Sequence, residues 1–78
     1  MTHELKISPE YFKAVKSGHK KFELRKDDRN FREGDLITLK EYKNGQYTGE
    51  EINNLLVLYI LRNCNDYGLK DGYCILGF

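Results

Sequence analysis

The sequence has few of the features that mark zinc-binding, disulfide-rich or metal-dependent proteins. Its 78 residues include two cysteines, two histidines, one proline and no tryptophan. Cys64 and Cys74 lack the CxxC or Cys/His spacing of a zinc site. Neither His3 nor His19 has a metal-like companion at helical or hairpin spacing. We therefore expect no metal site and no cofactor, and the sequence alone does not show whether the two cysteines lie close together.

Long apolar runs and a strong net charge are also missing. No run approaches the roughly 20 apolar residues that a bilayer-spanning helix needs, so we expect no membrane partner. The formal net charge is +1, which excludes an overall field that steers the protein to membranes or nucleic acids. Because the chain shows no signal peptide and needs no disulfide, we expect a cytoplasmic protein, and a monomer.

The length predicts one domain over residues 1–78. A chain of this size buries only about 60–65% of its unfolded surface, so its core must be small and its functional surface close to that core. Aromatic residues make up 13% of the chain, all of them tyrosine and phenylalanine, and they supply large buried areas per residue.

The first third of the chain predicts a strand followed by a short helix. Residues 3–7 alternate between apolar and polar side chains, as a strand does. Ser8 is a suitable N-cap and Pro9 a suitable first helical residue. Apolar residues at helical spacing follow, and Gly18 can adopt the left-handed conformation that ends a helix.

The rest of the chain predicts mainly strands. A turn is indicated by Asn44-Gly45, a common hairpin pair. The nearly continuous apolar run 55–61 is typical of a strand buried on both faces. The expected strands are 21–26, 36–42, 55–61 and 73–78, and residues 47–49 after the turn form either a short returning strand or an ordered loop. This is a mostly β (α+β) chain of five to six strands with one short N-terminal helix, and it closes most easily as a small mixed β-barrel without exposed edges.

The stretch from Gly18 to Arg29 carries the strongest functional signal. Phe22 and Leu24 share one strand face, which we expect to supply core, while Lys21, Glu23 and Arg25 share the other. Between residues 16 and 32, seven basic residues stand against three acidic ones, a pattern that favours local contact with an anion. The charged row is either a solvated ion-pair ladder, worth at most about 1 kcal/mol per pair, or the floor of a site for a polar ligand.

Other polar and aromatic residues admit two interpretations. Tyr42 and Tyr47 flank the predicted hairpin and suit either base stacking or packing. His3 suits a pH-sensitive contact, but we expect a histidine this close to a terminus to be solvated. No serine or threonine has the His/Asp partners that would mark a nucleophile.

One motif resembles a known family. Gly18-x-Lys20-x-x-Glu23-x-Arg25 is similar to the signature of the ASCH domain, a branch of the PUA-like superfamily. The resemblance continues over residues 3–12, 25–35, 47–49, 68–73 and 76–78, and looks like a compact bacterial and phage group of that superfamily.

The resemblance implies a pseudo-barrel with a helix near one end and a cleft for RNA or a nucleotide-like ligand. Carried onto this chain, Lys20, Glu23 and Arg25 are the expected ligand-facing residues. Lys6, Lys26, Asp28 and Tyr42 are second-rank candidates.

The resemblance also bears on catalysis. One ASCH branch hydrolyses acetylcytidine with a lysine, a threonine nucleophile and a distant glutamate. Lys20 matches that lysine, but Glu23 stands at the threonine's position and the helical insertion that carries the distant glutamate is absent. We therefore assign no catalytic residue, and we expect a binding module for RNA or a nucleotide.

Two alternatives stay open. The first is a small hydrolase of a modified nucleoside, in which Glu23 acts as a general base and Lys20 polarises a carbonyl. The second is a phage-derived adaptor that binds a protein partner.

Overall fold

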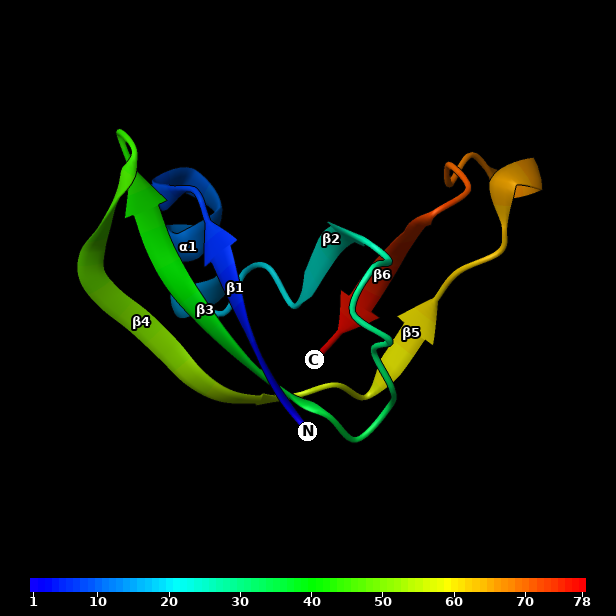
Figure 1. The fold of residues 1–78 in the computed structure, drawn as a ribbon, viewed down its shortest axis with the longest axis horizontal. Helices are drawn as coiled ribbons and strands as arrows, with labels where there is room; N and C mark the ends of the chain where they lie inside the picture. The colour runs from blue at the N-terminus through cyan, green and yellow to red at the C-terminus, as the bar shows by residue number, and fades with distance from the viewer.

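The computed structural model describes residues 1–78 and has six strands, one α-helix and a short 3-10 helix, η1 (Figure 1). The mostly β class and the single early helix are thus confirmed. The elements in chain order are β1 (Thr2–Ile7), α1 (Pro9–Lys16), β2 (Phe22–Lys26), β3 (Leu36–Lys43), β4 (Gln46–Leu56), β5 (Tyr59–Leu61), η1 (Asn65–Tyr67) and β6 (Tyr73–Gly77).

Local signals set the ends of α1. Ser8 occupies the N-cap with an extended backbone, although its side chain makes no capping hydrogen bond, and Pro9 is the first helical residue. Gly18 follows the helix with a φ of 83°, which a glycine adopts without steric cost. Phe12 and Val15 are buried on the face that packs against the sheets. The helix has eight residues, and no helix of the structure has the length and hydropathy needed to cross a bilayer.

The first sheet has the order β1–β3–β4. Strand β1 runs parallel to β3, with Leu5 opposite Leu39, and both side chains are fully buried. Strands β3 and β4 form an antiparallel hairpin. Its two turn residues, Asn44 and Gly45, have φ values of 51° and 83°, the positive values that a type I′ turn requires. The turn predicted from Asn-Gly is therefore confirmed.

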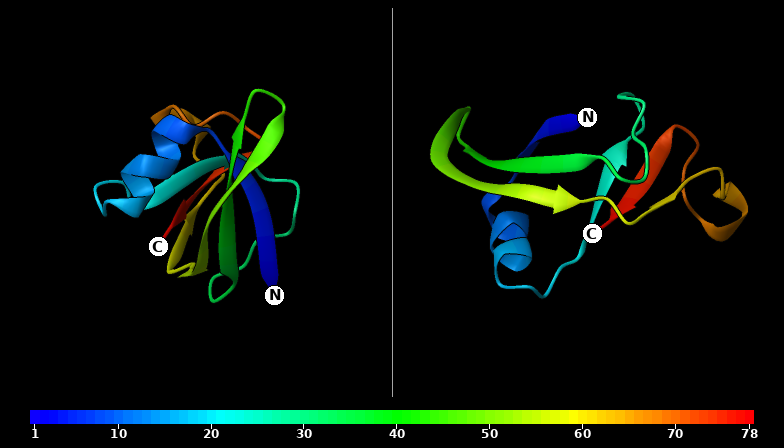
Figure 2. Two further views of the ribbon diagram at one scale, coloured as in Figure 1. Left: turned by 90° about the vertical axis from the view of Figure 1, so that its left-hand side faces the viewer. Right: turned by 90° about the horizontal axis from the view of Figure 1, so that it is seen from below.

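The second sheet has the order β2–β6–β5, with every neighbouring pair antiparallel. Figures 1 and 2 show the two sheets side by side, joined by the continuation of β4 into β5. At that junction the Val57 amide donates to the Asp35 carbonyl at 2.9 Å. The core lies between the sheets and α1, and consists of Leu5, Ile7, Phe12, Val15, Phe31, Ile37, Leu39, Val57, Ile60, Cys74 and Leu76.

The two sheets are open. No strand of the first sheet pairs with a strand of the second, so the closed barrel expected from the sequence is not confirmed. Side chains of β2 and of the segment after it bridge part of the gap to β1. Arg25 Nη1 donates to the Lys6 carbonyl at 2.7 Å, and Arg29 Nη1 donates to the Glu4 carbonyl at 2.8 Å. Two guanidinium groups thus satisfy carbonyls of β1 that have no strand partner on that side.

The orientation predicted for β2 is wrong. Phe22 and Leu24, the expected core residues, are 47% and 53% exposed, whereas Glu23 is 5% exposed. The alternation itself is correct, but the charged face of the strand points inward. This is possible because Glu23 has two cationic partners, and a paired, hydrogen-bonded carboxylate is far less costly to bury than an isolated one.

The prediction for residues 55–61 is also wrong. The run is not one strand buried on both faces but the end of β4, a two-residue connection and the three-residue β5. Its exposed members are Leu56, Leu58, Tyr59 and Leu61. The returning strand after the turn is correspondingly longer than expected, because β4 extends over 11 residues.

Candidate ligand-binding site

Lys20 and Glu23 form a close ion pair. Lys20 Nζ lies 2.5 Å from Glu23 Oε1 and donates a second hydrogen bond to the Phe22 carbonyl at 2.7 Å. The two side chains are only 15% and 7% exposed. Because both groups are largely shielded from water, their attraction is stronger than that of a surface pair. The solvated ion-pair ladder is therefore not what the structure contains at these two residues.

The turn after α1 places Lys20. The amide groups of His19 and Lys20 both donate to the Ala14 carbonyl, at 3.1 and 3.0 Å, and fold the chain back over the end of the helix. The chain then enters β2, whose pairing with β6 sets Glu23 opposite Leu76. Glu23 consequently faces inward while Lys20 reaches it from the strand's start.

Arg25 is the third member of the predicted set, and it is held differently. Its Nη1 lies 3.5 Å from Glu23 Oε2 and donates to the Lys6 carbonyl. The structure therefore brings Lys20, Glu23 and Arg25 together through the carboxylate of Glu23. Arg25 lies at the seam between β1 and β2, and it does not line the cavity that opens beside Lys20 and Glu23.

A cavity of about 310 Å³ opens beside this ion pair. Lys20 Nζ lies 4.8 Å from the ring centre of Phe22 and 5.3 Å from that of Tyr11, within the range of cation–π attraction. The cavity thus combines a charged pair with two half-exposed aromatic rings. Its lining residues are Tyr11, Lys20, Phe22, Glu23 and Leu24. Sequence reasoning missed Tyr11, Phe22 and Leu24 because it assigned these apolar side chains to packing.

The second-rank candidates do not gather at this cavity. Lys26 and Asp28 are exposed at and beyond the far end of β2. Lys6 and Tyr42 lie on the first sheet, where Lys6 Nζ is 4.4 Å from the ring centre of Tyr42. Tyr42 meets Tyr47 across the hairpin edge to face, with 5.1 Å between ring centres. This arrangement stabilises the hairpin through cross-strand aromatic contact.

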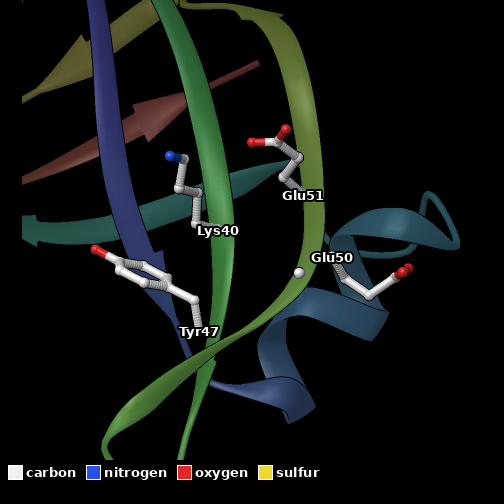
Figure 3. A pocket seen from close by; sticks show the side chains of 5 residues that line it. Lys40, Tyr47, Glu50 and Glu51 are labelled. Carbon is white, nitrogen blue, oxygen red and sulfur yellow. The ribbon is translucent and has the colours of Figure 1, made fainter.

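A second cavity, of about 240 Å³, lies along β4 and is lined by Lys40, Tyr47, Gly49, Glu50 and Glu51 (Figure 3). Lys40 pairs in register with Glu51 and lies 3.4 Å from Glu4. Glu50 points to the other side of β4, where it meets Lys16 at 3.4 Å. The one cation of this cavity is therefore already balanced by acidic neighbours, which makes the cavity a poor anion site.

His3 is buried, contrary to the solvated position expected for it. It is 6% exposed, its Nε2 lies 2.8 Å from Asp35 Oδ2, and its ring meets Phe31 at 4.7 Å between centres. The hydrogen bond with His3, a second from the Arg32 amide and the Met1 ammonium lower the pKa of Asp35 to about 2. No local signal in the sequence pointed to this pair, because its members stand 32 residues apart.

Two further groups have shifted pKa values. Burial raises the pKa of the Cys74 thiol to about 11, and the cysteine is fully buried. The hydrogen bond with Asp27 raises the pKa of Arg62. Asp27 and Arg62 form a two-point contact at 2.7 and 3.2 Å that ties the segment after β2 to the segment after β5. No group of three His, Cys, Asp or Glu side chains is placed to hold a metal ion.

Fold and site together define a small, mostly β protein with a shielded lysine–glutamate pair beside a surface cavity. The chain belongs to a family described as a domain of unknown function (DUF3850), whose model matches residues 2–78. It is also 42% identical over 50 residues to an "uncharacterized 12.9 kDa protein in GpA 3′ region" of Escherichia phage P2. That alignment covers 64% of this chain and 46% of the phage protein, so the matched part is less than half of the relative's length.

Proposed function

We propose that the protein is a binding module for RNA or a nucleotide-like ligand, and that the cavity beside Lys20 and Glu23 receives a nucleobase. The observation that carries this proposal is the combination found there. The Lys20 ammonium, 2.5 Å from the Glu23 carboxylate, lies near two half-exposed aromatic rings beside a cavity of about 310 Å³. Ligand sites are commonly apolar hollows with a few well-placed polar groups.

The chemistry of the pair suits the edge of a base. A carboxylate accepts a hydrogen bond from an exocyclic amine, such as N4 of cytosine, and an ammonium donates to a ring nitrogen or carbonyl. Phe22 and Tyr11 offer ring faces on which an unpaired base can stack. In this proposal Arg25 positions the carboxylate of Glu23 through its contact with the second carboxylate oxygen. Only the guanidinium N–H groups that are not already used in this contact or in the hydrogen bond to Lys6 would contact phosphate.

The resemblance to the ASCH domain supports the same site. In that family the Gly-x-Lys-x-x-Glu-x-Arg strand faces the ligand cleft, and here the matching strand turns its charged face inward. We propose that the chain also has the pseudo-barrel architecture of that family. The shared core and the arginine contacts across the β1–β2 seam support that architecture.

One geometric observation favours a second candidate function. A lysine and a glutamate in direct contact beside a cavity support this candidate, in which Glu23 would activate a water and Lys20 would polarise a carbonyl. The substrate would be an acylated nucleoside amine. Release of free acetate from acetylcytidine, lost in Glu23→Gln, would support it. Complete absence of turnover would leave the binding module alone.

The test of the binding module is calorimetric titration with cytidine and uridine monophosphates at two salt concentrations. We expect binding that favours cytidine monophosphate and weakens as salt rises. Lys20→Ala should weaken binding at least about tenfold, since a charged hydrogen bond is worth about 1.5–3 kcal/mol. Lys43→Ala is the matched control, because Lys43 is exposed at the end of β3 and lines no cavity. Equal effects of the two substitutions, or no binding of any nucleotide, would contradict the proposal.

A further inference from the structure

The outer face of the sheet β2–β6–β5 is apolar and has no covering element. Two rows cross it in register: Phe22, Gly77 and Tyr59, and then Leu24, Ile75 and Leu61. Its four outer-strand side chains, Phe22, Leu24, Tyr59 and Leu61, are between 40% and 63% exposed. The one α-helix packs against the other sheet (Figures 1 and 2). A contiguous exposed apolar patch of this kind marks a binding surface.

Leu24 stands between two hollows on this face. One is the cavity beside Lys20 and Glu23, and the other, of about 240 Å³, is lined by Leu24, Gly68, Leu69, Lys70 and Tyr73. Like the first hollow, the second has a lysine ammonium close to an aromatic ring. Lys70 Nζ lies 5.7 Å from the ring centre of Tyr73, as Lys20 Nζ lies 4.8 Å from that of Phe22.

The charges around the face have one dominant sign. The two register rows carry no charged side chain, whereas lysines stand at both ends of β2 and beside β6. They are Lys20, Lys21, Lys26 and Lys70. Acidic residues also stand near the second hollow: Asp71 accepts a hydrogen bond from Asn65 at 3.3 Å, Asp27 is paired with Arg62, and Asp28 is exposed. A second copy of the chain would bring the same lysines against this rim, so charge complementarity favours a partner with apolar faces and anionic edges.

Unpaired nucleotides have these properties. Their bases stack on aromatic and apolar side chains, and their phosphates attract lysines at the edge of the platform. Lys26 is the register partner of Tyr73 and stands three positions after Glu23 along β2. Three positions of extended chain span about 10 Å. That length exceeds one base, so a ligand that fills both hollows contains at least two nucleotides.

We propose that the outer face of β2–β6–β5 binds a single-stranded segment of nucleic acid, with one base beside Lys20 and Glu23 and a neighbouring base on Tyr73. This inference rests on the proposed function and deepens it, because it makes the ligand a strand and not a free nucleotide. The Tyr73 hollow supplies the second stacking position, and Lys70 contacts the adjoining phosphate.

The test compares hexacytidylate RNA with cytidine monophosphate by fluorescence anisotropy and calorimetry. Hexacytidylate should bind more tightly, and a DNA strand of the same sequence reports whether the sugar is read. Tyr73→Leu keeps an apolar side chain for folding but removes the ring, and should weaken hexacytidylate binding at least about fivefold, as expected for one lost base–aromatic stack. Lys70→Ala should lower the salt slope by about 1. Neither change should alter cytidine monophosphate binding.

Tyr67→Ala is the matched control, because Tyr67 is 89% exposed in η1 and lines neither hollow. If cytidine monophosphate binds but the strand binds no better, and Tyr73→Leu has no effect, this inference is overturned while the cavity proposal stands. If neither ligand binds, the proposed function fails and this inference with it. A duplex that binds as well as the single strand also overturns it. So does a stable dimer in sedimentation that Leu61→Lys dissociates, since the face would then be occupied by a second copy.

Discussion

His3 Nε2 and Asp35 Oδ2 lie 2.8 Å apart beneath the start of β3, and both residues are almost fully buried. The other carboxylate oxygen of Asp35 is 3.3 Å from the Met1 ammonium. The Arg32 amide completes the set with a hydrogen bond to Oδ2 at 3.0 Å. One carboxylate thus fastens the N-terminal strand to the segment that leads into its neighbour.

This carboxylate makes stability depend on pH in a defined window. The pKa of Asp35 is lowered from 3.8 to about 2, so the unfolded chain takes up a proton at a higher pH than the folded one does. The contribution of Asp35 to stability is therefore complete above about pH 4, and it is lost as the pH falls toward 2.

Urea unfolding of the native protein and of Asp35→Asn between pH 2 and 6 measures this contribution. The two stability curves should run parallel above about pH 4 and converge as the pH falls toward 2. Asp28→Asn is the matched control, because Asp28 is exposed and forms no hydrogen bond or ion pair within the chain. A separation between the native and Asp35→Asn curves that does not change with pH would contradict the assignment.

Features encoded by neighbouring residues were predictable from the sequence. Pro9 and Gly18 bracket the helix, and Asn44-Gly45 forms the hairpin turn, because each of these residues acts through its own backbone preference. The motif around Lys20 and Glu23 likewise identified a pair that the structure places in contact. In each case the interacting groups are at most a few residues apart.

Features that depend on distant partners were not predictable. Alternation in β2 shows that Phe22 and Glu23 lie on opposite faces, but not which face is inward; that choice depends on β6 and on the cations around Glu23. His3 is buried because it pairs with Asp35, which lies just before the start of β3. The run 55–61 looked like a core strand because apolar composition does not reveal which side of a sheet lacks a covering layer.

The Lys20–Glu23 pair should be thermodynamically coupled. Glu23→Gln and Lys20→Met should each lower the free energy of unfolding by about 1–3 kcal/mol, because each removes one charge of the pair and leaves the other shielded from water and less well compensated. The double variant should lose less than the sum of the two, by about 1 kcal/mol. Urea unfolding of the four proteins gives this coupling energy. Strict additivity would show that the pair contributes nothing beyond its individual side chains.

Arg29 should stabilise the outer edge of β1. Its guanidinium donates to the Glu4 carbonyl at 2.8 Å, so Arg29→Ala should cost about 0.5–1.5 kcal/mol and speed hydrogen exchange of the β1 amides. Arg32→Ala is the control, since the Arg32 side chain is exposed and only its backbone contacts Asp35. Unchanged exchange in β1 on removal of Arg29 would show that water replaces the guanidinium without loss.

The two cysteines should differ in reactivity. Cys74 is fully buried and its thiol pKa is about 11, so at pH 8 only about one thiol in a thousand is the reactive thiolate. Cys64 is half-buried in the segment before η1, and both are free thiols. Native protein treated with iodoacetamide should therefore gain one adduct, on Cys64, and protein in urea should gain two, as counted by mass spectrometry. Cys64→Ser should leave the native protein unmodified under the same conditions. Equal labelling of both cysteines before unfolding would mean that β6 opens far more readily than its fully buried position in the core implies.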